Sequence, residues 1–395
     1  MSRIKVAEIA EATAGGVREH LRQILTYVDR ERFDVSLLCS VRREQDFEPE
    51  LERFCAQGIP VVRVPMTRAI RPWNDLRCYR RIYWDLRVGR YDVVHTHGSK
   101  GGILGRLAAH RVGGSYVIHT GHTFPLQWAR GAKQLFYAGL ERRSARWADR
   151  IIALSDAQKQ QLLSARISPE EKITVLPNAA EVPAPCGSAP RDEARRKLGL
   201  PPDAPCAGMA GRIVHQKDPL LFVRAAAVIA ERRPDARLVW IGDGPLRRKM
   251  EAAANNAGIL GKNLIVAGHR QDVRELYAAF DVFLMTTRWE GMPYAVLDAM
   301  AAGLPVVAVN VPGMNEIVDD GVTGWLTGPD EQALAGEVLG LFDNADRRRA
   351  YGEAAMVRVR ERHSVSNFIA RLEEFYATDS QRVERKQTPQ TTEPA

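Results

Sequence analysis

Short apolar runs rich in β-branched residues alternate with amphipathic stretches through the first half of the chain. The runs that are typical of strands buried on both faces are residues 5–10, 34–39, 61–64, 93–95, 116–120 and 151–154. Between them, stretches such as residues 17–28 and 103–111 carry apolar side chains at helical spacing. Repeated alternation of this kind predicts a parallel sheet covered by helices on both faces.

The pattern weakens between residues 179 and 205, where prolines are frequent, and then resumes. A second set of strands is expected at residues 207–211, 237–241, 263–266, 281–285 and 305–309. We therefore predict an α/β chain with two doubly wound, Rossmann-like domains at residues 1–185 and 206–362. Residues 186–205 would link them through one short helix, and the polar tail at residues 380–395 would be disordered.

Composition places the chain among globular proteins, with 45% hydrophobic and 26% charged residues. No apolar run of eighteen residues occurs, and the first ten residues lack the long apolar core of a signal peptide. Five cysteines without a CxxC pair indicate neither a disulfide framework nor a zinc site. These features together predict a cytoplasmic protein.

The positive charge is concentrated in the first half. Residues 1–190 carry 29 Lys and Arg against 20 Asp and Glu, whereas the rest carry 27 against 28. Residues 63–90 hold eight arginines, with Trp73, Tyr79, Tyr83 and Trp84 interleaved. This combination suits an anionic membrane surface or a phosphate-bearing acceptor. The competing interpretation is a domain helix whose aromatic side chains pack inward. No nucleic-acid-binding motif accompanies the charge.

Doubly wound sheets bind ligands beyond the carboxyl ends of their strands, so the chemistry is sought there. Gly15-Gly16 follows the first expected strand, where it could contact a phosphate or sugar or simply form a tight turn. It is not a GxGxxG fingerprint, which argues against a dinucleotide. Histidines follow two further strands, as His95 and His97 and as His119 and His122. They favour hydrogen bonding to hydroxyls or proton transfer, most clearly for His97 and His122. A metal site is the alternative, but no acidic cluster with ligand spacing accompanies them.

The second half carries cations and carboxylates at its strand ends. Arg212 and Lys217 flank the expected start of a helix at Asp218-Pro219, a combination that can bind a diphosphate without a metal. Two ordinary surface cations are the rival interpretation. Glu290 and Asp298 lie eight positions apart, which predicts that both face one groove, where carboxylates could accept bonds from vicinal sugar hydroxyls. The segments 242–245 and 268–270 suit close backbone approach to a flat base.

With these residues in hand, the chain resembles glycosyltransferase family 4, whose members have the GT-B fold of two parallel-sheet domains facing across a cleft. The most specific match is residues 287–307, an acidic pair followed by a small-residue stretch ending in Gly-Leu-Pro-Val-Val. Further matches occur in the expected order, at residues 15–16, 95–98, 120–122, 176–178, 211–217, 241–245 and 312–316. One departure is Asp298, where the family usually has Glu.

The resemblance implies a role for each candidate residue. Arg212 and Lys217 would neutralise the donor diphosphate, Glu290 would hold donor sugar hydroxyls, and His122 would sit at the reacting sugar. The other implied donor contacts are Gly16, Gly242, Gly244, His269, Arg270, Gly291, Met292, Pro293 and, for the ribose, Asp298. The implied acceptor contacts are Gly15, His97 and Lys100. The acceptor domain would be completed by a helix at residues 363–378.

The function expected from the resemblance is a retaining, metal-independent glycosyltransferase without a cofactor. It would move a sugar from a nucleotide-sugar, such as a UDP-sugar, to a saccharide or polyprenyl-linked acceptor in cell-surface polysaccharide synthesis, at the inner face of the cytoplasmic membrane. The alternatives are an epimerase or phosphorylase of the same architecture and a non-catalytic nucleotide-sugar-binding subunit.

Overall fold

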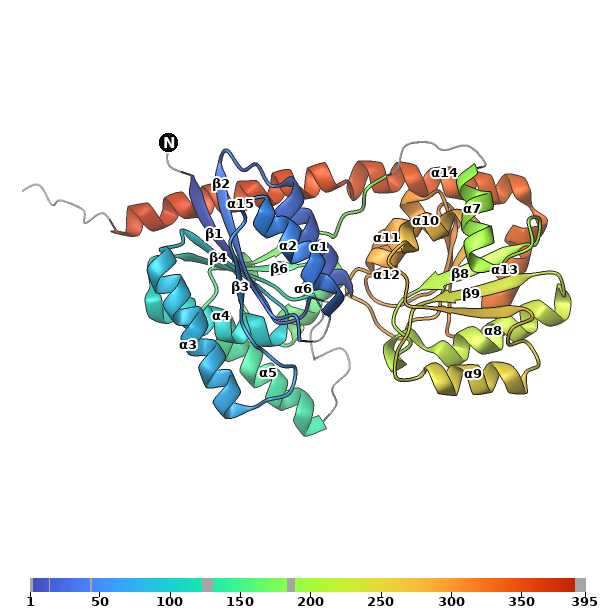
Figure 1. Cartoon of the computed structure of the whole chain (residues 1–395), viewed down its shortest axis with the longest axis horizontal. Coiled ribbons are helices and arrows are strands. Elements are labelled where there is room, and N and C mark those ends of the chain that lie inside the picture. Colours follow the sequence, from blue (N-terminus) through green and yellow to red (C-terminus); the bar gives the residue numbers. More distant parts are fainter. Residues whose placement is uncertain (1–2, 14, 43–44, 123–130, 183–188, 388–395) are drawn as a thin grey trace, which may run out of the picture. The chain divides into compact units, whose positions relative to one another are not determined.

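The chain forms two compact units, which are described separately. The computed structural model describes residues 3–13, 15–42, 45–122, 131–182 and 189–387, with side chains described as far as residue 378 except at residues 45 and 189. Unit 1 comprises Met1–Pro177 and Ser366–Ala395, and unit 2 comprises Asn178–Val365. Figure 1 shows the course of the chain.

Unit 1 is built on a seven-stranded parallel sheet with the order β3-β2-β1-β4-β5-β6-β7. Its strands are β1 (Ile4–Ala10), β2 (Phe33–Cys39), β3 (Val61–Arg63), β4 (Val93–His97), β5 (Tyr116–Thr120), β6 (Arg150–Ala153) and β7 (Ile173–Val175). Its helices are α1 (Gly15–Tyr27), α2 (Glu48–Ala56), α3 (Pro72–Gly89), α4 (Ser99–Val112), α5 (Gly131–Ala145), α6 (Asp156–Ser164) and α15 (Val365–Gln387). Helices α1 and α15 cover one face of the sheet, and α3 and α4 cover the other (Figure 1). The core on the α3–α4 side includes Ile9, Ile82 and Ala108.

Unit 2 contains a six-stranded parallel sheet with the order β10-β9-β8-β11-β12-β13. Its strands are β8 (Cys206–Ala210), β9 (Arg237–Ile241), β10 (Leu264–Gly268), β11 (Val282–Met285), β12 (Val306–Val309) and β13 (Gly324–Thr327). Its helices are α7 (Ala189–Leu198), α8 (Pro219–Arg232), α9 (Arg247–Asn256), α10 (Val273–Leu276), α11 (Tyr294–Ala301), α12 (Met314–Ile317), α13 (Glu331–Asp343) and α14 (Ala345–Arg362).

The predicted strands lie where the apolar runs placed them, shifted by one or two residues at their ends. One expectation was wrong: His95 and His97 do not follow a strand but lie within β4, and His119 lies within β5. Helix α7, in the expected linker, belongs to unit 2, where Arg191 and Arg195 pair with Asp281. Helix α15 continues to Gln387, past the point where the disordered tail was expected to begin.

Each sheet reverses its strand order at one place, and these places position the candidate residues. In unit 1, successive crossovers run outward on either side of the neighbouring strands β1 and β4. In unit 2 the corresponding neighbours are β8 and β11. Crevices outside the carboxyl ends of such strand pairs are the usual ligand sites of doubly wound sheets. None of the helices in the described part of the chain has the length and hydropathy needed to cross a membrane.

Candidate functional site

In unit 2, the loops that follow β8 and β11 meet through a buried ion pair. Lys217 Nζ lies 2.7 Å from Glu290 Oε1, and the side chain of Glu290 is only 7% exposed. The hydroxyl of Thr287 donates a second hydrogen bond to the same carboxylate oxygen, at 2.8 Å. The structure therefore brings together one predicted phosphate-binding cation and the predicted sugar-binding carboxylate.

Hydrogen bonds to backbone carbonyls connect these two loops. The Thr286 hydroxyl donates to the carbonyl of Lys217 at 3.0 Å, and the Thr287 hydroxyl oxygen lies 3.0 Å from the carbonyl oxygen of Gln216. The amide of Arg288 donates to the same Gln216 carbonyl at 2.8 Å. Because several bonds connect the segments, Lys217 and Glu290 are held on a braced frame.

Helix α8 begins beside this pair. Asp218 is its N-cap and accepts a hydrogen bond from the amide of Leu221 at 3.3 Å. The backbone of Asp218 is left-handed, with φ of 46°, and its carboxylate is held by Arg288 at 2.6 Å. Pro219 at the first helical position needs no amide partner. The positive end of the helix dipole thus adds to the charge of Lys217, while Arg212 lies exposed just after β8.

The glycines after β9 allow two loops to pass in contact. A Cβ atom at Gly242 would lie 2.1 Å from the carbonyl oxygen of Gly211, and one at Gly244 would lie 2.5 Å from the carbonyl oxygen of Ile213. The Gly242 amide also donates to the Gly268 carbonyl at 2.7 Å. These glycines therefore have a packing role that accounts for their small size without a ligand.

Helical spacing does not connect Glu290 with Asp298, because only Asp298 lies on the helix, and their facing one groove stays a prediction. Helix α11 begins at Tyr294 with Pro293 as its N-cap, so Glu290 lies in the loop before the helix. Asp298 is on the helix and accepts from Arg274 Nε at 3.3 Å. The two carboxylates thus bind different cations.

The remaining donor-loop residues are fixed by local contacts. Arg270 forms a two-pronged pair with Asp272, with N–O distances of 2.8 and 2.7 Å, whereas His269 is exposed. Gly291, Met292 and Pro293 are buried, and the carbonyl of Met292 accepts from Asn178 Nδ2 at 2.8 Å. In the loop after β10, Asp272 thus holds the Arg270 side chain, and contact of this loop with a base stays a prediction.

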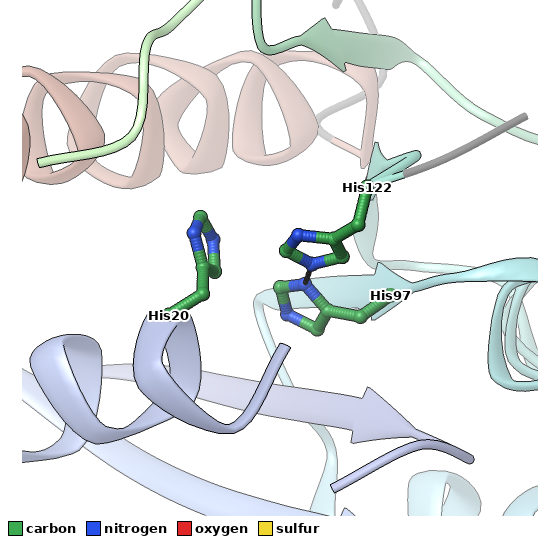
Figure 2. Close-up of side chains that lie close together, drawn as sticks. All are labelled: His20, His97 and His122. Atoms are coloured by element: carbon green, nitrogen blue, oxygen red, sulfur yellow. Dashed lines mark hydrogen bonds between the residues drawn. The ribbon is translucent and has the colours of Figure 1, made fainter. Parts of the chain in front are cut away.

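In unit 1, buried histidines lie beside the switch point, the place between β1 and β4 where the strand order reverses. Figure 2 shows His20 from α1, His97 at the end of β4 and His122 just after β5. Nδ1 of His97 lies 3.3 Å from Nε2 of His122, and the ring of His20 meets that of His122 edge-on at 4.7 Å. Nε2 of His97 lies 2.6 Å from Glu8 Oε2. His97 and His122, predicted separately, are thus in contact.

Burial controls the charge of this cluster. It lowers the pKa of His97 to about 4, with His95 adding to the shift and Glu8 opposing it. Burial, with smaller contributions from His20 and His97, also lowers the pKa of His122 well below its usual value. Burial alone would raise the pKa of Glu8, but the charge of His95 and hydrogen bonds from His95 and His97 outweigh it and lower that pKa. At neutral pH, His97 and His122 are neutral and Glu8 is ionised.

The other predicted residues of unit 1 lie at two helix starts. Helix α1 begins at Gly15, whose φ of 54° is left-handed, and Gly16 follows it on the exposed first turn. Lys100 lies on the first turn of α4, where its Nζ donates to Asp75 Oδ1 at 2.7 Å. Both segments follow the two switch-point strands.

Within the part of the chain that the structure describes, two sets of side chains have the chemistry and spacing for a metal ion. They are His20, His97 and His122, and Glu8, His95 and His97, with ligand atoms within 4.8 Å of one another in each set. Both sets need His97, whose two ring nitrogens already face Glu8 and His122. A hydrogen-bonded network accounts for this arrangement through side chains alone.

Comparison with known proteins adds a family match in each half of the chain. The family model described as "Glycosyl transferases group 1" matches residues 190–358, and "Glycosyl transferase 4-like domain" matches residues 15–179. The Escherichia coli protein "UDP-Gal:alpha-D-GlcNAc-diphosphoundecaprenol alpha-1,3-galactosyltransferase" is 32% identical over 331 residues, covering 82% of this chain and 84% of its own. A "D-inositol 3-phosphate glycosyltransferase" of Thermobispora bispora is 32% identical over 75% of this chain and 73% of its own.

Solved structures share the fold. The Anabaena protein HepE, crystallised in complex with UDP and glucose, superposes with a TM-score of 0.81 at 20% identity, over 95% of this chain and 100% of its own. The predicted α/β class with two parallel-sheet domains, GT-B, is confirmed.

Proposed function

Since the chain belongs to the group 1 glycosyltransferases, we propose that it moves a sugar from a UDP-sugar to a lipid-linked saccharide, with retention of anomeric configuration. The acceptor would carry a diphosphate and a polyprenyl chain, because the E. coli relative is named for such a substrate. The product would contribute to a cell-surface polysaccharide. Retention rests on the family resemblance.

The observation that carries this proposal is the Lys217–Glu290 pair at the switch point of unit 2. A nucleotide-sugar presents a diphosphate next to a polyhydroxylated ring, and the pair presents an ammonium next to a carboxylate. The amino end of α8 adds donors suited to phosphate oxygens. The carboxylate suits hydroxyl groups, which donate hydrogen bonds to it.

The proposed mechanism is electrostatic. As the bond between the sugar and the β-phosphate breaks, negative charge develops on the phosphate oxygens. Lys217, Arg212 and the start of α8 would stabilise that charge, so no metal ion would be required. Glu290 would keep the sugar in position while the bond breaks. The charge available from the chain's own cations supports metal independence.

The first test is a donor screen of the purified protein. We expect one UDP-sugar to raise the melting temperature and to be hydrolysed slowly in EDTA, whereas GDP- and ADP-sugars do neither. A donor at 100 times its Kd should add about 2.7 kcal/mol of stability. Transfer to a synthetic GlcNAc-diphospho-lipid is then measured by mass spectrometry, and NMR of the product reports the anomeric configuration.

The outcomes of the screen separate the alternatives. Stabilisation by a GDP-sugar would overturn the choice of donor, and activity only with added Mg²⁺ or Mn²⁺ would overturn metal independence. Isomerised donor without acceptor would indicate an epimerase instead. Product with inverted configuration would reject retention while leaving the transferase intact.

An exposed basic and aromatic surface on α3 supports membrane association of unit 1. The aromatic residues predicted on this helix divide: Tyr79 and Tyr83 pack against the core, whereas Trp73 and Trp84 are 86% and 58% exposed. Arg87 lies over the ring of Trp84, 5.6 Å from its centre. Further arginines of the segment are also exposed: Arg71, Arg77, Arg80, Arg81 and Arg90. We propose that this α3 surface binds an anionic lipid headgroup layer.

Replacing Trp73 and Trp84 with alanine is expected to weaken binding to phosphatidylglycerol vesicles about tenfold or more, because each indole loses burial worth roughly 1.5–3 kcal/mol. Vesicle co-sedimentation measures the effect. Tyr27→Ala serves as the control, because Tyr27 is an exposed aromatic residue of α1. Equal binding by all variants, or wild-type binding that persists at high salt on neutral vesicles, would contradict the proposal.

A further inference from the structure

A buried carboxylate stands at the start of a hydrogen-bonded chain that ends at His122. Glu8 lies in β1 and is fully buried. Its Oε2 accepts from Nε2 of His97 at 2.6 Å, and Nδ1 of His97 faces Nε2 of His122 at 3.3 Å. The other carboxylate oxygen, Oε1, accepts from the hydroxyl of Tyr376 on α15 at 2.5 Å. This series of hydrogen bonds therefore joins β1, β4, the end of β5 and α15.

The ionised carboxylate of Glu8 determines which ring nitrogen of His97 and of His122 carries the proton. An ionised carboxylate only accepts hydrogen bonds, so His97 must carry its proton on Nε2. Because His97 is neutral, its Nδ1 is a lone pair. His122, also neutral, must then carry its proton on Nε2 to donate to that lone pair. Nδ1 of His122 is left as an acceptor, suited to the hydroxyl group of a sugar.

We propose that Glu8 is a positioning residue of the transferase: through His97 it holds His122 in the Nε2–H tautomer and so directs the Nδ1 lone pair of His122 to a substrate hydroxyl. This inference rests on the proposed function for the contact of His122 with substrate. The tautomer itself does not depend on that function. Neither Glu8 nor its connection to His122 was among the residues expected from the sequence.

Two neighbours stabilise the carboxylate without setting the tautomer of His122. Nδ1 of His95 lies 2.8 Å from the Tyr376 hydroxyl, and its Nε2 lies 2.8 Å from the Thr120 hydroxyl. Tyr376 therefore accepts from His95 while it donates to Glu8. Both side chains keep Glu8 in place, but only His97 connects it to His122.

The test replaces Glu8 with glutamine, which has the same shape but can present an N–H to His97. Where it does so, His97 and then His122 must move their protons to Nδ1. We expect kcat to fall about 10- to 100-fold, as for other partners that orient a functional histidine. The KM for the donor should stay within about threefold, since the donor diphosphate is bound by unit 2.

Glu373→Gln is the matched control. Glu373 is a residue of α15 whose carboxylate accepts hydrogen bonds from the Asp29 amide at 2.8 Å and from Arg32 at 3.1 Å. Neither of these two bonds involves a histidine. It should retain wild-type kcat. Protein labelled with ¹⁵N-histidine, without substrate, reports the tautomers directly. Wild-type His97 and His122 should both carry the proton on Nε2, and Glu8→Gln should shift both toward Nδ1–H.

Three results would overturn the inference. They are a wild-type His122 protonated on Nδ1, a Glu8→Gln enzyme with wild-type kcat, and an equal loss of kcat in Glu373→Gln. Should Glu8→Gln not fold, the wild-type spectrum still decides the tautomer. If the wild type transfers no sugar, the proposed function fails, and the spectrum still tests the role of Glu8.

Discussion

Lys217→Ala is expected to lower kcat by about 10²–10³-fold, which corresponds to about 2.7–4 kcal/mol of lost transition-state stabilisation. The reason is that the leaving diphosphate would lose the cation that is held beside it by Glu290, 2.7 Å away. The same change leaves a buried carboxylate without its ammonium partner, so the melting temperature should also fall. Steady-state kinetics with the donor found in the screen measure the first effect, and thermal unfolding the second.

A control and a double variant separate these two effects. Arg224→Ala removes a solvent-exposed ion pair with Glu331 elsewhere in unit 2 and should leave kcat unchanged. Lys217→Ala combined with Glu290→Ala should lose less activity than the product of the two single losses, because both residues act on one bound sugar diphosphate. Fully multiplicative losses, or a Lys217→Ala enzyme as active as wild type, would contradict the proposed site.

Acid is expected to unfold unit 1 before unit 2. Burial lowers the pKa of His97 and of His363 to about 4, and lowers those of His119 and His122 well below the usual value. In the unfolded chain, histidine titrates near pH 6.5. Between these values the unfolded state binds more protons, so the stability contributed by neutral histidines is complete above about pH 6.5 and is lost as the pH falls toward 4.

The size of this effect is large compared with ordinary stability. A pKa lowered from 6.5 to about 4 corresponds to a loss of the order of 3 kcal/mol at full protonation of one histidine, against a total of about 5–15 kcal/mol for a typical protein. Three of the four histidines belong to unit 1 and only His363 belongs to unit 2. The lowered pKa of Glu8 adds to this effect, because the stability that its ionised form contributes is also lost as the pH falls below the pKa of an unfolded glutamate.

The measurement is thermal unfolding at pH 7.5 and pH 5 at constant ionic strength, with hydrogen exchange to assign the units. We expect the first transition to move down by about 10 °C or more and amides of β4 and β5 to lose protection first. An unchanged melting temperature at pH 5, or earlier loss of protection in unit 2, would show that these histidines are not buried as neutral groups.

The sequence was a good guide to the fold because buried parallel strands leave continuous apolar runs. It predicted eleven of the thirteen strands in the described residues, and the two that it missed explain the limit. Strand β7 has three residues, Ile173–Val175, and β13 begins with a glycine at Gly324. Both lie at sheet edges, where short strands suffice. Such runs are too brief to stand out from loops.

The candidate site was harder, because its contacts depend on distant segments. Lys217 and Glu290 were each expected at the donor, but their pairing requires the β8–β11 neighbourhood that only the folded sheet supplies. The helix that carries Asp298 begins at Tyr294, as expected, so helical spacing cannot relate Asp298 to Glu290 in the preceding loop. Glu8 did leave a signal: a carboxylate among the apolar residues 6–10 of a buried strand must find buried partners.

Unit 1 is formed by two separate parts of the chain, Met1–Pro177 and Ser366–Ala395, and this affects how it can fold during synthesis. During synthesis, β1 and its sheet emerge early, yet Tyr376, the partner of Glu8, is 368 residues further along the chain. Phe368, which packs on His20, and Glu373, which caps the turn at Asp29, arrive equally late. While unit 2 is being synthesised, helix α15 is absent, so the carboxylate of Glu8 lacks its partner Tyr376. The unit begun first is therefore completed last, and a fragment that stops after Pro177 would lack one wall of its own core.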